Sequence, residues 1–278
     1  MMRIGARAHD YGKQDAFSLA SRLAADGFTT VQLAPVKAIS GINSFSDITP
    51  DVLADTKHAF ERANIAIDVL GCYVELGAAD EDERLACVDH FLTGIDHALA
   101  LGSQFIASET TNFSGSEKER EARYERLLEG VSRIAKKAEN AGVTACIEPV
   151  FLHTLNTAKL ARKMLDTIRS PHLKIVFDPV NMLTVDNLHD QSRIFDEYFE
   201  LLGADIAVVH VKDVDDQLLW CNLGNGIVRY NTLIPRLRAL NRDFPLLREH
   251  VRPDSAHIDT DAMRNWIGAA SFDKEMNQ

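Results

Sequence analysis

Short apolar runs alternate with longer amphipathic runs along the whole chain. The apolar runs have the length of β-strands, and we expect eight strands, at residues 3–8, 29–35, 65–71, 104–109, 143–149, 173–179, 205–212 and 244–251. Successive runs begin between 26 residues (3 to 29) and 39 residues (65 to 104) apart. Such an interval holds one strand, one helix and two loops, which is a βα unit.

The segment 116–142, SEKEREARYERLLEGVSRIAKKAENAG, shows why the intervening runs are expected to be helices. From Tyr124 to Ala138 its apolar residues recur at i, i+3, i+4 and i+7, which gives one buried stripe. Ser116 and Glu119 have the spacing of a capping box, and Gly142 stands where a glycine ends a helix. We expect Gly27, Gly102 and Gly203 to mark helix ends in the same way.

The repetition of these units predicts one domain over residues 1–278. Runs with little polar alternation, such as LKIVF and IAVV, are typical of parallel strands covered on both faces. Eight units in about 250 residues indicate a (β/α)8 TIM barrel. A doubly wound open sheet is the alternative, but no G-x-G-x-x-G follows the first expected strand.

Charge and composition narrow the classes of partner. The net charge is −11, from 30 basic and 41 acidic residues, whereas a nucleic-acid-binding protein usually has a basic face. The four cysteines form no C-x-x-C pair, which favours reduced thiols in a cytoplasmic protein. No apolar stretch of 18 residues is present, and the start MMRIGARAHDYGK has no apolar core of a signal peptide. We therefore expect neither a nucleic acid nor a membrane as partner.

The last four expected strands all end on a residue that can bind a metal. These residues are Glu148 in CIEPV, Asp178 in IVFDPVN, His210 in VVHVKDV and Glu249 in FPLLREHV. In a parallel barrel these strand ends converge on one face, where barrel enzymes carry out their chemistry. Side chains alternate along a strand, so Cys146, Val176, Val208 and Leu247 share the faces of these four residues, and Lys212 shares the face of His210.

Three carboxylates this close repel one another unless a cation lies between them or some of them are protonated. An oxygen-rich site with one nitrogen suits a single divalent ion, with manganese first and magnesium, cobalt or zinc as alternatives. Each residue alone has a plainer interpretation, as a helix N-cap, a solvated acid or a structural histidine. The metal hypothesis rests on all four occurring at successive strand ends.

Through the motifs IEP, FDPVN, VVHVKD and LGNGIVRY and the final Glu249, the chain resembles the xylose-isomerase-like TIM-barrel superfamily. That family includes sugar isomerases and epimerases, inosose dehydratases and apurinic endonucleases. The resemblance implies a divalent metal held by Glu148, Asp178, His210 and Glu249. In the ketose 3-epimerase branch it further implies that Glu148 and Glu249 are the acid/base pair, acting on a small ketose or related polyol ketone through an enediolate. Barrels of this family often form homodimers.

Further residues are candidates for substrate binding. Lys212 shares the face of His210, Asn181 stands where several relatives carry a histidine, and Trp220 offers an apolar wall for a sugar ring. Glu109 and His153 lie in or near loops of the active face. Each of them is otherwise an ordinary loop residue. Asn181 argues against a second metal, and Asp216 stands where 3-epimerases carry an arginine, so the branch stays open. Few basic residues other than Lys212, Arg229 and Arg252 flank the strand ends, which favours an unphosphorylated substrate.

Three other functions compete with a metal-dependent sugar isomerase or 3-epimerase. An inosose-type dehydratase would use the same enediolate and then expel a β-hydroxyl, giving an enone that absorbs in the ultraviolet. An apurinic endonuclease would need more histidine ligands and would nick an abasic duplex. A non-catalytic sugar-binding barrel would not need to keep all four ligand types.

Overall fold

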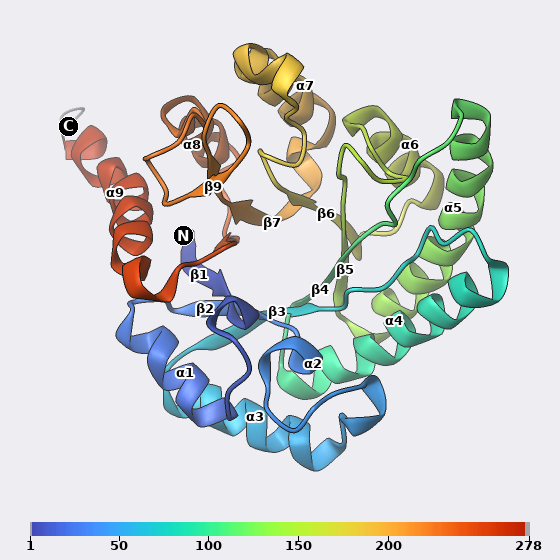
Figure 1. Cartoon of the computed structure of the whole chain (residues 1–278), viewed down its shortest axis with the longest axis horizontal. Coiled ribbons are helices and arrows are strands. Elements are labelled where there is room, and N and C mark those ends of the chain that lie inside the picture. Colours follow the sequence, from blue (N-terminus) through green and yellow to red (C-terminus); the bar gives the residue numbers. More distant parts are fainter. Residues whose placement is uncertain (1, 276–278) are drawn as a thin grey trace.

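Eight parallel strands close into a barrel in the computed structural model, which describes residues 2–275 (Figure 1). The strands neighbour one another in the order β1-β10-β7-β6-β5-β4-β3-β2. Their bounds are β1 (Arg3–Arg7), β2 (Thr30–Leu33), β3 (Ala66–Gly71), β4 (Phe105–Glu109), β5 (Thr144–Glu148), β6 (Leu173–Phe177), β7 (Ile206–Val211) and β10 (Pro245–Arg248). The chain is therefore a single-domain TIM barrel, and the expected eight strands are confirmed.

Helices surround the barrel. They are α1 (Ala16–Ala25), α2 (Pro35–Ala38), α3 (Pro50–Arg62), α4 (Glu81–Leu101), α5 (Glu117–Ala141), α6 (Ala158–Ile168), α7 (Gln191–Leu202), α8 (Tyr230–Ala239) and α9 (Ala256–Glu275). In α5 the Ser116–Glu119 capping box is present, and its expected apolar stripe is buried. No helix in the part of the chain that the structure describes is long and apolar enough to cross a bilayer.

The helix ends follow the sequence in most cases. Gly102 and Gly142 are left-handed C-caps of α4 and α5, with φ of 77° and 71°. Gly203 ends α7 differently: its φ of −49° is right-handed, and the chain continues into a short 3-10 turn, Gly203–Asp205. The turn needs no positive φ at this position, so the expected glycine cap is replaced by a gradual exit from the helix.

A small layer of buried apolar side chains lies inside the barrel. It consists of Val69, Ala107, Cys146, Val176, Val208 and Leu247. The last four lie two residues before Glu148, Asp178, His210 and Glu249, so strand alternation aims the four polar residues into the barrel above this layer. The four polar residues and this apolar layer therefore share the interior face of the barrel.

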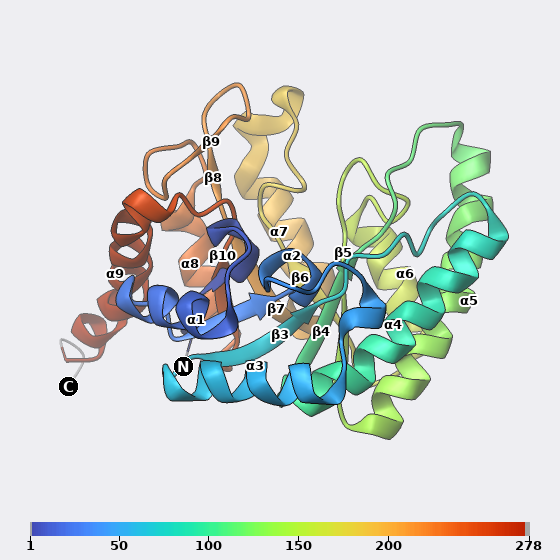
Figure 2. The same cartoon turned by 60° about the horizontal axis from the view of Figure 1, so that its bottom comes forward.

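Loops on the carboxyl side of the strands form the wall around this interior. Figure 2 shows the loops after β4, β5, β6 and β7 rising on the same side of the barrel. The loop after β7 contains a small antiparallel hairpin, β8 (Asp213–Val214) paired with β9 (Trp220–Cys221). This hairpin carries Trp220 over the end of the barrel.

Candidate metal centre

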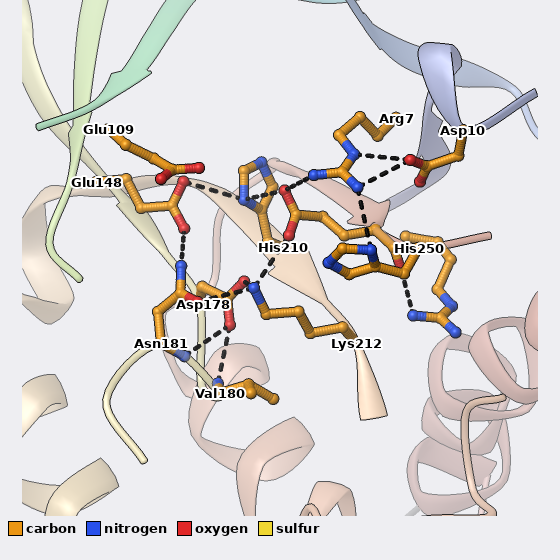
Figure 3. A network of polar contacts seen from close by, with 12 residues as sticks. Arg7, Asp10, Glu109, Glu148, Asp178, Val180, Asn181, His210, Lys212 and His250 are labelled. Carbon is orange, nitrogen blue, oxygen red and sulfur yellow. Dashed lines mark hydrogen bonds and ion pairs between the residues drawn. The ribbon is translucent and has the colours of Figure 1, made fainter. Parts of the chain in front are cut away.

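The strand ends bring the expected residues together in a buried cluster (Figure 3). Glu148 is the last residue of β5, His210 lies in β7, and Asp178 and Glu249 directly follow β6 and β10. Their exposed fractions are only 2% to 3%. Ligand atoms of Glu148, Asp178 and His210 lie within 4.8 Å of one another, close enough to share one ion.

His210 lies at the middle of the cluster. Its Nδ1 atom is 3.3 Å from Glu148 Oε2 and 3.3 Å from Glu249 Oε1. This buried nitrogen has no hydrogen bond of good geometry to either oxygen. The opposite nitrogen, Nε2, is 2.7 Å from Gln32 Oε1. Burial alone would lower the pKa of His210, but Glu148 and Glu249 together outweigh burial and raise its pKa to about 9.

Glu249 differs from Glu148 in its partners. Arg7 Nη1 donates to Glu249 Oε1 at 3.2 Å, and Lys212 Nζ donates to Glu249 Oε2 at 3.0 Å. Burial opposes ionisation of Glu249, but Lys212, His210 and Arg7 overcome it and hold its pKa well below the usual range. Asn181 Nδ2 donates a hydrogen bond to Glu148 Oε1 at 2.5 Å (Figure 3), and burial raises the pKa of Glu148 despite His210. Glu148 is thus the more basic of the two glutamates.

Lys212 is surrounded by three oxygen atoms. Its Nζ lies 2.8 Å from Asp178 Oδ2, 3.0 Å from Glu249 Oε2 and 2.8 Å from Asn181 Oδ1. Only 3% of the residue is exposed. Burial disfavours the ammonium, but Asp178 and Glu249 prevail and raise the pKa of Lys212 above its usual value. The lysine is therefore a fixed positive charge inside the cluster.

The donor set fits one divalent cation. Arg7 bridges Glu249 to Asp10, donating to Asp10 Oδ1 at 2.8 Å. Asp10 and the three cluster carboxylates therefore face two permanent cations, Arg7 and Lys212, which leaves two negative charges unbalanced when all four acids are ionised. The lone pair of a neutral His210 would point at these oxygens from Nδ1. A single divalent ion would supply the two missing positive charges and would give the unpartnered Nδ1 of His210 a partner.

The expected substrate-binding residues surround this cluster. Asn181 and Lys212 contact the cluster acids directly. Glu109 pairs in register with Glu148, and His153 Nε2 lies 3.7 Å from Glu109 Oε2. Burial first, and then Glu148 and Glu249, raise the pKa of Glu109 to about 7. Burial lowers the pKa of His153 to about 4.

Trp220 covers one side of the cluster. Its ring stacks on His250 with centroids 4.0 Å apart, and Lys212 Nζ lies 5.1 Å from the ring centroid. The residue is 41% exposed, which leaves part of it free to contact a ligand. The position suits the apolar wall expected for a sugar ring.

Sequence reasoning missed Arg7, Asp10, Gln32 and His250. Arg7 corrects the expectation that few basic residues flank the strand ends: it ends β1 and pairs with Glu249. Arg7 Nη2 also lies 3.3 Å from His250 Nδ1. A signal existed for Gln32, because it is the polar residue of the buried strand TVQL with a side chain long enough to cross the barrel.

Comparison with known proteins agrees with this fold. The family model described as xylose isomerase-like TIM barrel matches residues 20–269, and the chain belongs to this family. Among curated proteins, none matches the chain in sequence.

Solved structures show the same barrel at low identity. A D-tagatose 3-epimerase-like protein has a TM-score of 0.79 at 15% identity, covering 98% of this chain and 99% of that one. A 3-keto-D-glucoside 4-epimerase from E. coli has a TM-score of 0.74 at 18% identity, covering 95% and 98%. The IOLI protein, solved with a bound zinc atom, has a TM-score of 0.71 at 14% identity, covering 96% and 99%.

Proposed function

We propose that the protein is a divalent-metal-dependent sugar isomerase or epimerase that acts on a small ketose or related polyol ketone through an enediolate. The observation that carries the proposal is the buried Glu148–Asp178–His210 cluster, with Glu249 against the same histidine nitrogen. The family and the epimerases among the structural neighbours support it.

Glu148, Asp178, His210 and Glu249 would hold the ion, manganese in the first instance. When bound, such an ion supplies Lewis-acid stabilisation of the negative charge that develops on the substrate oxygens. The protein's own groups do the rest. Glu148, the more basic glutamate, takes the proton from the carbon beside the carbonyl, and Glu249 acts as its acid/base partner. Lys212 and Asn181 orient substrate oxygens, and Trp220 lies against the sugar ring.

A specific observation favours a dehydratase as second candidate. Glu109 lies beside Glu148 with its pKa raised to about 7 and with His153 as a neighbour. A carboxyl that is half protonated at neutral pH can donate a proton to a leaving hydroxyl. The ties of Glu249 to Arg7 and Lys212 also suit a reaction in which Glu148 is the one strong base.

The test is a screen of ketoses and inososes with chelated protein to which Mn²⁺, Co²⁺ or Mg²⁺ is added back. Products are followed by NMR and by ultraviolet absorbance, since an enone indicates the dehydratase and a new ketose the isomerase or epimerase. In ²H₂O, turnover should place deuterium on the carbon beside the carbonyl.

For the substrate found, Glu148→Gln and Glu249→Gln should each lower kcat by at least about 100-fold, the scale of general acid–base catalysis, with metal occupancy restored. Glu200→Gln, an exposed glutamate on α7, is the matched control and should leave kcat unchanged. Near-normal turnover of either cluster variant with metal bound would refute the two-glutamate mechanism.

A further inference from the structure

A chain of two hydrogen bonds runs from Tyr73, in the segment after β3, through Gln32 of β2 to the cluster histidine. Gln32 Nε2 donates to the Tyr73 hydroxyl at 2.8 Å, and Gln32 Oε1 is 2.7 Å from His210 Nε2. Gln32 is 1% exposed and belongs to β2, whereas His210 belongs to β7. Two strands, β1 and β10, lie between them in the barrel wall, so the amide reaches His210 through the interior.

The direction of these bonds determines which histidine nitrogen carries hydrogen. The side-chain nitrogen of Gln32, Nε2, faces the Tyr73 hydroxyl. The atom that Gln32 presents to His210 is therefore its carbonyl oxygen, Oε1, which can only accept a hydrogen bond. His210 Nε2 must therefore donate. The proton that His210 can give up is then the one on Nδ1, the nitrogen that faces Glu148 and Glu249.

We propose that Gln32, supported by Tyr73, is a positioning residue that fixes the ring and the tautomer of His210 so that Nδ1 is the metal ligand. The inference rests on the proposed function, because it takes His210 as a ligand of the proposed ion. A metal-bound histidine whose second nitrogen donates to a fixed acceptor is oriented and made a better ligand. With the amide reversed, Gln32 would donate to Nε2 and leave the hydrogen on Nδ1, where it blocks the metal.

The test compares acceptors at position 32. Gln32→Leu removes the acceptor at similar size and should weaken Mn²⁺ binding about 10- to 100-fold, the usual effect of losing such a partner. Gln32→Glu keeps an oxygen acceptor and should restore binding to within a few-fold of wild type. Tyr73→Phe keeps Gln32 but frees its amide, and we expect a smaller, few-fold loss.

The matched control is Gln191→Leu. Gln191 is also a buried glutamine, 2% exposed. Its side-chain Nε2 donates to Leu188 O and Ile227 O, and its Oε1 accepts from Arg229 N, away from the cluster. Its loss should lower stability without changing Mn²⁺ affinity. A structural effect alone would make the two leucine variants alike, and a role in metal binding makes them differ.

A second readout is the tautomer itself. Protein labelled with ¹⁵N-histidine and loaded with Zn²⁺ should show His210 protonated at Nε2, and His210→Gln identifies its signal. The inference is overturned by a hydrogen on Nδ1, by Mn²⁺ affinity in Gln32→Leu within twofold of wild type, or by equal losses in Gln32→Leu and Gln32→Glu. If Gln32→Leu does not fold, the Mn²⁺ affinities of Tyr73→Phe and Gln32→Glu test the inference in its place.

The two hypotheses fail separately. If the wild-type protein binds Mn²⁺ and turns over a sugar, but substitutions at Gln32 leave its Mn²⁺ affinity unchanged, only the proposed role of Gln32 is refuted. Wild-type protein that binds no divalent ion removes the proposed function and the inference together. If Mn²⁺ binds as expected but no sugar is turned over, the proposed activity is refuted and the role of Gln32 in metal binding is not.

Discussion

At the scale of single residues, the centre is defined by how each charge is balanced. Lys212 puts an ammonium between Asp178 and Glu249, and Arg7 links Glu249 to Asp10. Removing one partner of such a buried pair leaves an uncompensated charge, which is far more costly than the pair itself is stabilising. The two cations therefore help to keep Glu249 ionised in the metal-free protein, whereas the pKa values of Glu148 and His210 are raised.

The proton on His210 makes metal binding dependent on pH. In the metal-free protein the pKa of His210 is raised to about 9, so below pH 9 an incoming ion must displace the Nδ1 proton. Mn²⁺ affinity should then rise about tenfold per pH unit from pH 7 to 9 and level off above. Titration calorimetry in buffers of different ionisation enthalpy should show about one proton released per ion at pH 7.5. Affinity that is flat between pH 7 and 9 would contradict this account.

The site residues that the sequence predicts are those placed by the alternation of side chains along a strand. Glu148, Asp178, His210 and Glu249 end successive strands, so alternation alone aims them at one point. Arg7, Gln32 and His250 escape prediction for a physical reason. Their contacts join strands that are distant in sequence: Arg7 of β1 contacts residues that follow β10, and Gln32 of β2 reaches His210 of β7. No local period in the sequence indicates which long side chains make such contacts. The roles of the predicted residues also depend on partners: only the structure shows that Arg7 and Lys212 bind one glutamate and not the other.

At the scale of elements, the loop after β7 is organised by Asp213. Its carboxylate accepts hydrogen bonds from four backbone N–H groups, of Val214, Gly224, Gly226 and Val228, at 2.9 to 3.1 Å. At Gly226 an added Cβ would overlap Asp213 Oδ1 and the Val214 carbonyl oxygen, so the LGNG turn needs glycine there. The motif VHVKD–LGNG is thus one unit, in which the aspartate after the cluster lysine folds the loop that carries Trp220.

We expect Asp213→Asn to loosen this loop. An amide cannot accept at both ends, so at least one pair of the four bonds is lost, and the unfolding free energy should fall by about 2 kcal/mol in urea denaturation. Limited proteolysis should cut faster within residues 215–226, while Mn²⁺ affinity stays within a few-fold of wild type. Asp216→Asn, an exposed aspartate in the same hairpin, is the control and should behave like wild type. Unchanged proteolysis in Asp213→Asn would show that the loop is held by other contacts.

The strands and α5 follow from local pattern, whereas the details of this loop do not. Burial on both faces and the period of the apolar residues specify where β5, β6 and β7 lie, and the capping box specifies where α5 begins. The sequence DDQLLWCNLGNG contains no such period. Its fold depends on Asp213 and on a second buried acid, Asp259, which accepts from Leu223 N at 2.7 Å and from Arg248 Nε at 2.8 Å. Tertiary contacts from α9 therefore complete what the local sequence leaves open.

At the scale of the whole molecule, the barrel concentrates unbalanced negative charge at one buried point of an acidic protein. The net charge of the chain is −11. The cluster of Asp10, Glu148, Asp178 and Glu249 faces two permanent cations, Arg7 and Lys212, and without a bound ion also His210, whose pKa is raised to about 9. Folding must bring these acids together, so repulsion within the cluster opposes folding in the absence of an ion. The same repulsion is relieved when a divalent ion binds, which couples metal binding to the stability of the whole barrel.

Removal of the metal should therefore lower the melting temperature, and one ion per chain should restore it. At an ion concentration of 100 times Kd, binding adds about 2.7 kcal/mol to the unfolding free energy, which for a barrel of this size raises Tm by about 5–10 °C. Mass spectrometry or atomic absorption should find about one ion per chain, and Asp178→Asn and His210→Ala should lose both the ion and the rise in Tm. Asp186→Asn, an exposed aspartate in the loop after β6, should keep both. Two tightly held ions per chain would contradict a single-ion centre. A Tm that is indifferent to chelation and to added Mn²⁺ would mean that the cluster balances its charge by keeping protons.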